Sequence, residues 1–267
     1  MDETQKGNPR HAQESPSSRR RPASPPARIP FWARVAGVTG ELLLTFGILV
    51  LAFVGWQLTL ADQQTSSAQQ ATAQQASRNW ARRHPSTTTP QPLRNPPGAS
   101  PRPRVGELVG ALHVPRLGAN WARPLIGGTT LSVLNKLGAG WYPSTSMPGA
   151  VGNTAFASHR GGHGSNFQYL DTLRYGDKVV LETQEGWYVY DYRNTEYVLD
   201  TAVEVVNPVP QSTAAPQERL LTLTTCNPYP FTNGERMIVY STFDEFYPRA
   251  GGLPSTLTRL LEHGQGN

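Results

Sequence analysis

The chain has 267 residues, a formal net charge of +5 and a single cysteine. The charge is divided unevenly, because residues 1–104 carry a net +8 and residues 105–267 a net −3. The basic charge therefore lies outside the C-terminal part, which argues against a nucleic-acid-binding surface there, and one cysteine excludes an intramolecular disulfide.

The N-terminal end combines a basic tail with an apolar run. Residues 1–34 hold seven cations, which are Lys6, Arg10, Arg19, Arg20, Arg21, Arg28 and Arg34. Residues 42–61, "LLLTFGILVLAFVGWQLTLA", carry no charge and are long enough to cross a hydrocarbon layer of about 30 Å as a helix. We predict one transmembrane helix over residues 35–61. The alternative is a cleaved signal peptide, which normally has a shorter apolar core and a shorter leader.

The basic tail also predicts the topology. By the positive-inside rule the N-terminus stays in the cytoplasm and the rest of the chain lies outside the cell. We therefore expect a single-pass protein of the cell membrane, with residues 105–267 extracellular.

Residues 62–104 predict a linker. They are rich in Gln, Ala, Ser, Thr, Pro and Arg and hold few large apolar residues, so they cannot bury enough surface to offset the entropy of ordering. We expect a low-complexity, disordered linker whose Gln/Ala half can be partly helical and whose Pro-rich half is extended and semi-rigid.

Residues 105–250 predict one mainly β domain. Short apolar strands with turn residues between them fit 178–183, 187–192, 201–209, 220–225 and 237–242, and short helices fit 130–137 and 166–174. Many strands and few helices favour a closed β-barrel with helices at its rim. Residues 251–267 form a C-terminal tail that can hold one short helix.

Cys226 is the first candidate functional residue. It ends the apolar strand "LLTLTT" and begins a loop rich in Asn, Pro, Gly and Thr. A buried and inert cysteine is the ordinary alternative. In an exported protein, however, an unpaired cysteine indicates an intermolecular bond or a reactive thiol, and the end of a strand places it at the rim of a barrel, where pockets form.

A thiol nucleophile needs a base or an imidazolium partner. His159 has the same context as Cys226, because it follows the strand "NTAFAS" and begins a glycine-rich loop. His163 lies farther out in that loop and is expected to be solvated, His113 fits a structural or surface position, and His263 is in the tail. A metal pair of His159 and His163 is not expected, because this segment cannot be helical through its glycines.

The oxyanion formed by thiolate attack needs a stabilising donor. Arg236 opens the strand after the Cys226 loop, so a hairpin would return it beside the cysteine; a surface salt bridge is its alternative role. Arg160 competes for the role but, being adjacent to His159 along the chain, is expected to point elsewhere.

Three separated motifs resemble the sortase family. "TLTTC" (222–226) followed by "NPYPFTNGER" resembles its cysteine and arginine signature, and "PGAVGNTAFASHR" (148–160) resembles its histidine strand. "LGAGWYPSTSMPG" and "LDTLRYGDKVVLET" match the flanking segments, so the resemblance runs from about 114 to 242. The chain departs from the family at Ser158, where glycine is usual, and at Asn227, where histidine is common.

The resemblance implies a fold and an activity. Sortases are membrane-anchored cysteine transpeptidases of Gram-positive bacteria with an eight-stranded barrel. By resemblance Cys226 is the nucleophile, His159 the general acid/base and Arg236 the ligand of substrate and oxyanion, while Tyr142, Ser158 and Thr225 shape the substrate site. The enzyme would cleave a C-terminal sorting signal between Thr and Gly and join the acyl group to a peptidoglycan-precursor amine.

The N-terminal anchor and "LTTCNP" look most like the class E housekeeping sortases of high-GC bacteria, which prefer Leu-Ala-x-Thr-Gly over Leu-Pro-x-Thr-Gly. Tyr142 falls about where that class carries a tyrosine facing the second residue of the signal. The resemblance implies no cofactor. Without a carboxylate cluster near the site, no metal ion is expected either.

Three other functions compete with this interpretation. An L,D-transpeptidase has a different cysteine signature, which "LTTCNPYP" does not match. A thiol hydrolase on the same barrel would differ only in whether water reaches the thioacyl group. A non-catalytic sortase-like surface protein would have lost one of the three catalytic residues, and all three are present.

Overall fold

The computed structural model describes residues 30–97 and 101–264. The chain divides into two units, residues 1–53 and 54–267. Most of the predicted basic tail, residues 1–29, lies outside the described residues. The helix α1 (Phe31–Arg83) begins in the first unit, after Pro30, and ends in the second. Its leucines 42–44 are about two-thirds exposed. Within the described ranges, α1 is the one helix long and apolar enough to cross a membrane.

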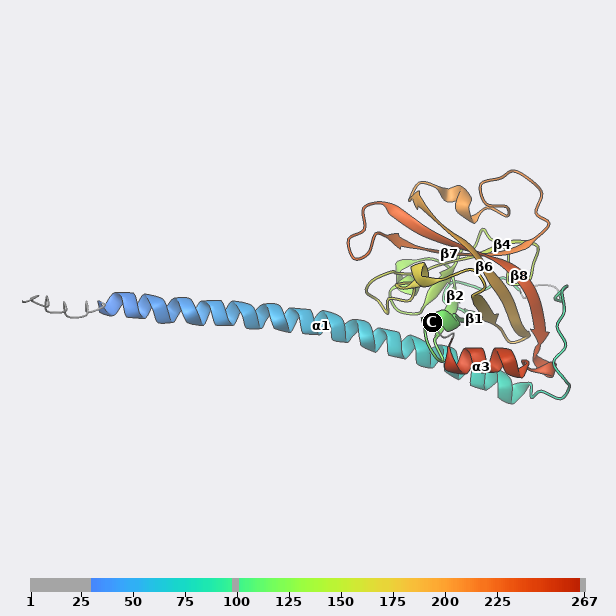
Figure 1. Cartoon of the computed structure of the whole chain (residues 1–267), viewed down its shortest axis with the longest axis horizontal. Coiled ribbons are helices and arrows are strands. Elements are labelled where there is room, and N and C mark those ends of the chain that lie inside the picture. Colours follow the sequence, from blue (N-terminus) through green and yellow to red (C-terminus); the bar gives the residue numbers. More distant parts are fainter. Residues whose placement is uncertain (1–29, 98–100, 265–267) are drawn as a thin grey trace, which may run out of the picture. The chain divides into compact units, whose positions relative to one another are not determined.

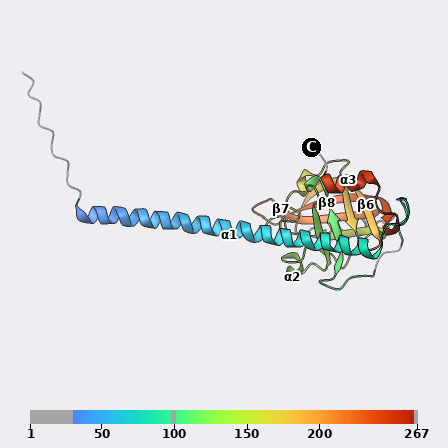
Figure 2. The same cartoon turned by 90° about the horizontal axis from the view of Figure 1, so that it is seen from below.

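The second unit is a closed barrel of eight strands in the order β1-β2-β3-β4-β7-β8-β6-β5 (Figures 1 and 2). The strands are β1 (Leu108–His113), β2 (Ala122–Gly127), β3 (Ala139–Trp141), β4 (Gly152–Ala157), β5 (Lys178–Glu182), β6 (Gly186–Leu199), β7 (Arg219–Asn227) and β8 (Glu235–Pro248). β2–β3 and β4–β7 pair in parallel and the other neighbours antiparallel. The predicted barrel is confirmed.

The barrel interior is filled by large side chains. Trp141, Phe156, Phe167, Tyr188 and Tyr190 are all at most 1 % exposed and belong to one cluster. Closure of the sheet removes free strand edges, and burial of these rings contributes to the hydrophobic stabilisation of the fold.

Short helices lie between the strands and after the last strand, β8. They are α2 (Leu131–Leu134), α3 (Ser255–His263) and the 3-10 turns η1 (Pro115–Leu117), η2 (Leu170–Thr172), η3 (Val203–Val206) and η4 (Arg249–Gly251). Two expectations were wrong. Residues 201–209, predicted as a strand, contain the 3-10 turn η3 instead. Residues 166–174, predicted as a helix, form turns around η2. In both segments the apolar residues pack on the barrel without regular pairing, as Val205 does.

The structure corrects the expectation of a disordered linker for residues 62–83, here called the arm. The arm continues α1, and its buried face is Gln69, Ala73, Ala76 and Trp80. Ala73 packs on Ala111 and Ala122 of the barrel. The arm is helical because Gln, Ala and Arg are good helix formers. Its alanines recur at helical spacing, and their small side chains let the helix backbone lie close to the barrel. The arm ends near Pro85, whose ring disfavours a helical residue before it.

The Pro-rich half also contacts the barrel. The Thr87 N–H donates to Ala250 O at 2.8 Å, and Leu93 exchanges backbone hydrogen bonds with Phe246 of β8 at 2.8 and 2.9 Å. These bonds satisfy backbone groups that a free linker would leave to water.

Candidate active site

Cys226 and Arg236 face each other across one strand pair. The β7–β8 ladder runs from Leu220 opposite Thr242 to Asn227 opposite Glu235, and within it Cys226 is the partner of Arg236. Directly opposite residues project on the same face of a sheet. The hairpin therefore places the guanidinium on the side of the thiol, where the sequence predicted it.

His159 reaches the same sheet edge by a different route. β4 and β7 pair in parallel up to Ala157 opposite Thr224, so both strands end at one edge. His159 and Cys226 each come two residues after that last pair. The parallel pairing thus brings the imidazole and the thiol to one end of the barrel.

A cavity of about 480 Å³ joins the three candidates. Its wall includes all six site residues expected from the sequence, which are Tyr142, Ser158, His159, Thr225, Cys226 and Arg236. The rest of the wall is largely apolar and comes from α2, β6, η3 and β8, with Leu131, Leu134, Val198, Val203, Val205, Val206 and Ile238. Such a cavity suits an extended peptide with apolar side chains.

A second cavity, of about 410 Å³, also borders His159 and Cys226. It shares only His159 and Cys226 with the first cavity and is otherwise formed by Arg160, Gly161, Gly162, Tyr229, Pro230 and Thr232. The ring of Tyr229 lies so close to Gly161 that a Cβ there would be 2.6 Å from it. The thiol and the imidazole thus border two separate hollows.

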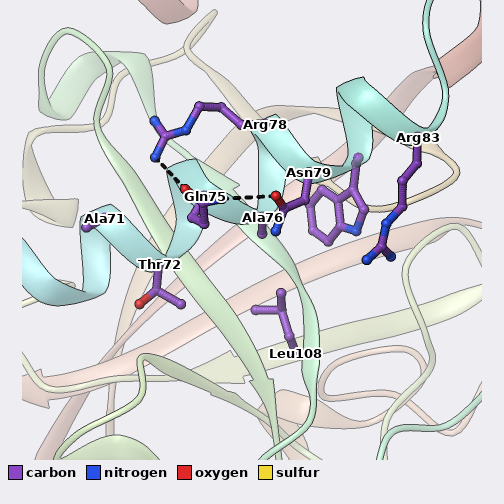
Figure 3. Close-up of a pocket in the computed structure, with 9 residues that line it drawn as sticks. Ala71, Thr72, Gln75, Ala76, Arg78, Asn79, Arg83 and Leu108 are labelled. Atoms are coloured by element: carbon purple, nitrogen blue, oxygen red, sulfur yellow. Dashed lines mark hydrogen bonds between the residues drawn. The ribbon is translucent and has the colours of Figure 1, made fainter.

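A larger hollow of about 650 Å³ lies along the arm and contains none of the candidates (Figure 3). Its wall includes Gln75, Arg78 and Asn79, which bond to one another at about 3 Å. Its wall contains no cysteine, histidine or carboxylate, so no side chain there could activate a nucleophile such as the Thr72 hydroxyl.

His159 is oriented by two neighbours. Its Nε2 lies 2.8 Å from Asn135 Oδ1. Because an amide oxygen only accepts, Nε2 carries the hydrogen and donates it. The His163 ring lies 4.8 Å away, centroid to centroid. Burial lowers the pKa of His159 below its usual value of 6.5, the charge of His163 lowers it further, and Asp62 opposes both.

Arg236 is only partly engaged. One nitrogen donates to Glu235 O at 3.0 Å and another lies 3.6 Å from Asp200 Oδ2. The two side chains of this ion pair are 34 % and 49 % exposed, and exposed pairs of this kind contribute little energy. A guanidinium has five donors, so donors remain for a ligand in the cavity.

The remaining candidates have well-defined contacts. Thr225 is buried and its hydroxyl donates to Ser158 O at 2.8 Å, which ties the end of β7 to the end of β4. The Tyr142 hydroxyl lies 2.8 Å from Thr224 Oγ1. Arg160 is buried, and its guanidinium is engaged by Asp171 and Asn227. His113 is not part of this cavity, and its Nε2 lies 2.9 Å from Glu182 Oε2.

Sequence reasoning missed several residues around His159. Asn135 lies inside the predicted helix 130–137 and carried no motif, and η3 was predicted as a strand. Asp62 and Gln69 were assigned to the linker, although the Gln69-Ala73-Ala76-Trp80 spacing of four, three and four could have revealed a buried helical face.

Comparison with known proteins decides the family. A family model described as the sortase domain matches residues 112–244. The chain is 34 % identical to sortase SrtE1 of Streptomyces coelicolor over 242 residues, or 86 % of this chain and 64 % of that protein. It is 30 % identical to SrtE2 of the same organism over 78 % of this chain and 81 % of that protein. The chain belongs to the sortase family.

The likeness extends to the fold. The structure of the SrtA sortase from Actinomyces oris superposes with a TM-score of 0.58 at 35 % identity, covering 62 % of this chain and 96 % of that one. Sortases are cysteine transpeptidases that anchor proteins to the cell wall. The chain spans 64 % of the length of SrtE1, and its likeness to SrtE1 and SrtE2 agrees with the class E motifs in its sequence.

Proposed function

We propose that this sortase is a membrane-anchored transpeptidase that cleaves a C-terminal sorting signal of the Leu-Ala-x-Thr-Gly or Leu-Pro-x-Thr-Gly type between Thr and Gly, and that joins the new acyl end to a cell-wall amine. Its N-terminus would lie in the cytoplasm and its barrel outside the cell. The observation that carries the proposal is the convergence of Cys226, Arg236 and His159 on one apolar cavity.

In the first half-reaction the Cys226 thiolate attacks the carbonyl carbon of the signal's threonine. The charge that develops on the carbonyl oxygen is stabilised by Arg236, whose position opposite Cys226 suits this role. The C–N bond to glycine then breaks, the leaving amine takes a proton from His159, and a thioester remains on Cys226.

In the second half-reaction an amine attacks the thioester. His159 accepts the proton of the amine, the C–S bond breaks, and an amide forms between the surface protein and the acceptor. The two hollows support a division of labour. The apolar cavity would hold the acyl segment, and the more polar hollow beside Tyr229 and Thr232 would admit the amine.

Tyr142 is the candidate for reading the second residue of the signal. Its phenol is fixed at the cavity wall by the 2.8 Å contact to Thr224. Thr225 and Ser158 hold the strand ends together. Their place in this proposal is therefore to shape the cavity.

The test uses the full chain in detergent, with Leu-Ala-x-Thr-Gly and Leu-Pro-x-Thr-Gly peptides and an amine, read by intact mass. The expected result is a thioacyl adduct on the wild type, absent from Cys226→Ala, which converts to an amine-joined product. An adduct that gives only the free acid, even with excess amine, would indicate a thiol hydrolase. No adduct from a folded chain whose thiol alkylates readily would refute the proposal.

A further inference from the structure

The loop that begins at His159 has an unusual backbone. Four successive residues have positive φ, with values of 72° at Gly162, 53° at His163, 95° at Gly164 and 46° at Ser165. Two of them are not glycine, and a non-glycine residue in this region is disfavoured unless its surroundings hold it there. Something outside the loop must therefore stabilise this conformation.

The arm supplies those contacts. The Asp62 carboxylate accepts hydrogen bonds from the Gly164 N–H at 2.6 Å and from the Ser165 hydroxyl at 2.7 Å. Seven residues later, on the same face of the helix, Gln69 is buried and its amide donates to His163 O at 3.3 Å. A Cβ on Gly164 would lie 2.6 Å from the Gln69 side-chain oxygen, so the arm and the loop fit closely.

These contacts act on both sides of His159. On one side the loop places the His163 ring 4.8 Å from the His159 ring, and the Phe167 N–H donates to His159 O at 3.0 Å. On the other side Gln69 also donates to Lys136 O at 3.3 Å. Lys136 follows Asn135, whose side chain binds His159 Nε2.

We propose that Asp62 and Gln69 are positioning residues for His159, and that the docked arm makes the acid/base catalyst competent. Neither side chain lines either of the two cavities that border Cys226. Their effect passes through the 162–165 backbone and the end of α2. The catalytic meaning of this inference rests on the proposed function, because it assigns His159 the proton-transfer role.

The test compares three variants of the full chain in detergent. Asp62→Ala removes both acceptors. Asp62→Asn is the conservative variant, because its amide oxygen can accept from Gly164 and its amide N–H can donate to Ser165. Thr72→Ala is the matched control, since the Thr72 hydroxyl donates to Ala68 O within the same helix. Thr72 is an exposed residue that lines the hollow along the arm (Figure 3), away from the His159 loop. Transfer of the sorting peptide to an amine gives kcat and KM, and backbone hydrogen exchange reports the loop.

For Asp62→Ala we expect kcat to fall on the order of ten-fold, because a small displacement of a catalytic group is costly, with KM little changed. Exchange should become faster in residues 162–165 and stay unchanged in β7 and β8. Asp62→Asn should recover most of kcat, and Thr72→Ala should match the wild type in both measurements.

Several outcomes would overturn the inference. One is a wild-type kcat in Asp62→Ala, and another is faster hydrogen exchange throughout the barrel of that variant. The third is a fall in kcat in Asp62→Asn and Thr72→Ala as large as that in Asp62→Ala. A wild-type chain that transfers no acyl group would refute the proposed function instead. Hydrogen exchange would still decide whether Asp62 holds the loop.

Discussion

The two halves of the proposed catalytic set are held in different ways. Cys226 and Arg236 sit in a continuous β7–β8 ladder, where each backbone pair fixes the next. His159 lies beyond the last β4–β7 pair, in a loop stabilised by Asn135 and by an arm about a hundred residues earlier in the chain. Cys226 is thus positioned by local backbone pairing, whereas His159 is positioned by side chains distant in the sequence. The two halves should differ in how substitutions affect them.

The largest expected effect is on the nucleophile. Cys226→Ala should abolish the thioacyl adduct and lower turnover on the order of 10⁴-fold or more, because removal of a nucleophile leaves only binding and electrostatic effects. Intact mass and product formation measure this. Since the β7–β8 ladder does not depend on the thiol, the thermal unfolding curve of Cys226→Ala should match that of the wild type. Turnover by Cys226→Ala at the wild-type rate would contradict the role assigned to Cys226.

Arg236 tests the other ladder position. Arg236→Ala should lower kcat on the order of 10²-fold, the usual cost of removing an oxyanion donor, while Arg236→Lys should retain part of the activity by keeping the charge. Steady-state kinetics measure both. Asp200→Asn is the control, because it removes the exposed partner of Arg236 and leaves the guanidinium in place. An equal loss in Asp200→Asn would show that the ion pair, not the arginine, matters.

The arm is anchored by a buried carboxylate, and this anchor should be sensitive to acid. Burial alone would raise the pKa of Glu182, but the hydrogen bond with His113, together with Ser77 of the arm and Arg249, lowers it to about 2. A lowered pKa stabilises the fold at pH values above the usual 4.5, and that stability is lost as the pH falls from 4.5 towards 2. The contribution at neutral pH is up to about 3 kcal/mol.

Denaturant unfolding measured at several pH values checks this expectation. Glu182→Gln should be less stable at neutral pH, and its stability should change less between pH 4.5 and 2. A pH dependence identical to that of the wild type would contradict the assignment.

The smallest expected effect is on the titration of His159. Its pKa should lie below 6.5, because burial and the neighbouring His163 disfavour the imidazolium. His163→Ala should raise this pKa towards 6.5, and Asp62→Asn should lower it, since the carboxylate that favours the charged form is lost. Proton NMR of the His159 ring measures the midpoint. A shift of the His159 pKa in the same direction in both variants would contradict this electrostatic account.

Sequence patterns predicted the ladder half of the site well. The apolar runs around Cys226 and Arg236 and the turn residues between them are local signals, so the hairpin and the pairing of the two side chains could be anticipated. The approach of His159 could also be inferred, from the likeness of its strand end to that of Cys226.

The other half depended on contacts that leave a weak local signal. The arm buries alanines and a glutamine, and small side chains give little hydrophobic contrast between the faces of a helix, so low complexity was mistaken for disorder. Asn135 and Asp62 act only because the barrel and the docked arm bring them near His159. η3 packs Val205 on the barrel without strand pairing, which alternation alone cannot distinguish from a strand.

The close approach of Tyr229 to Gly161 has a consequence for exchanging parts between relatives. Because no Cβ fits between them, the loop after Cys226 and the loop after His159 are shaped as complementary surfaces. A β7–β8 loop transplanted from another sortase should therefore disturb His159 unless the matching 160–165 segment is transplanted with it. The two loops should therefore be exchangeable only together, although more than sixty residues separate them in the chain.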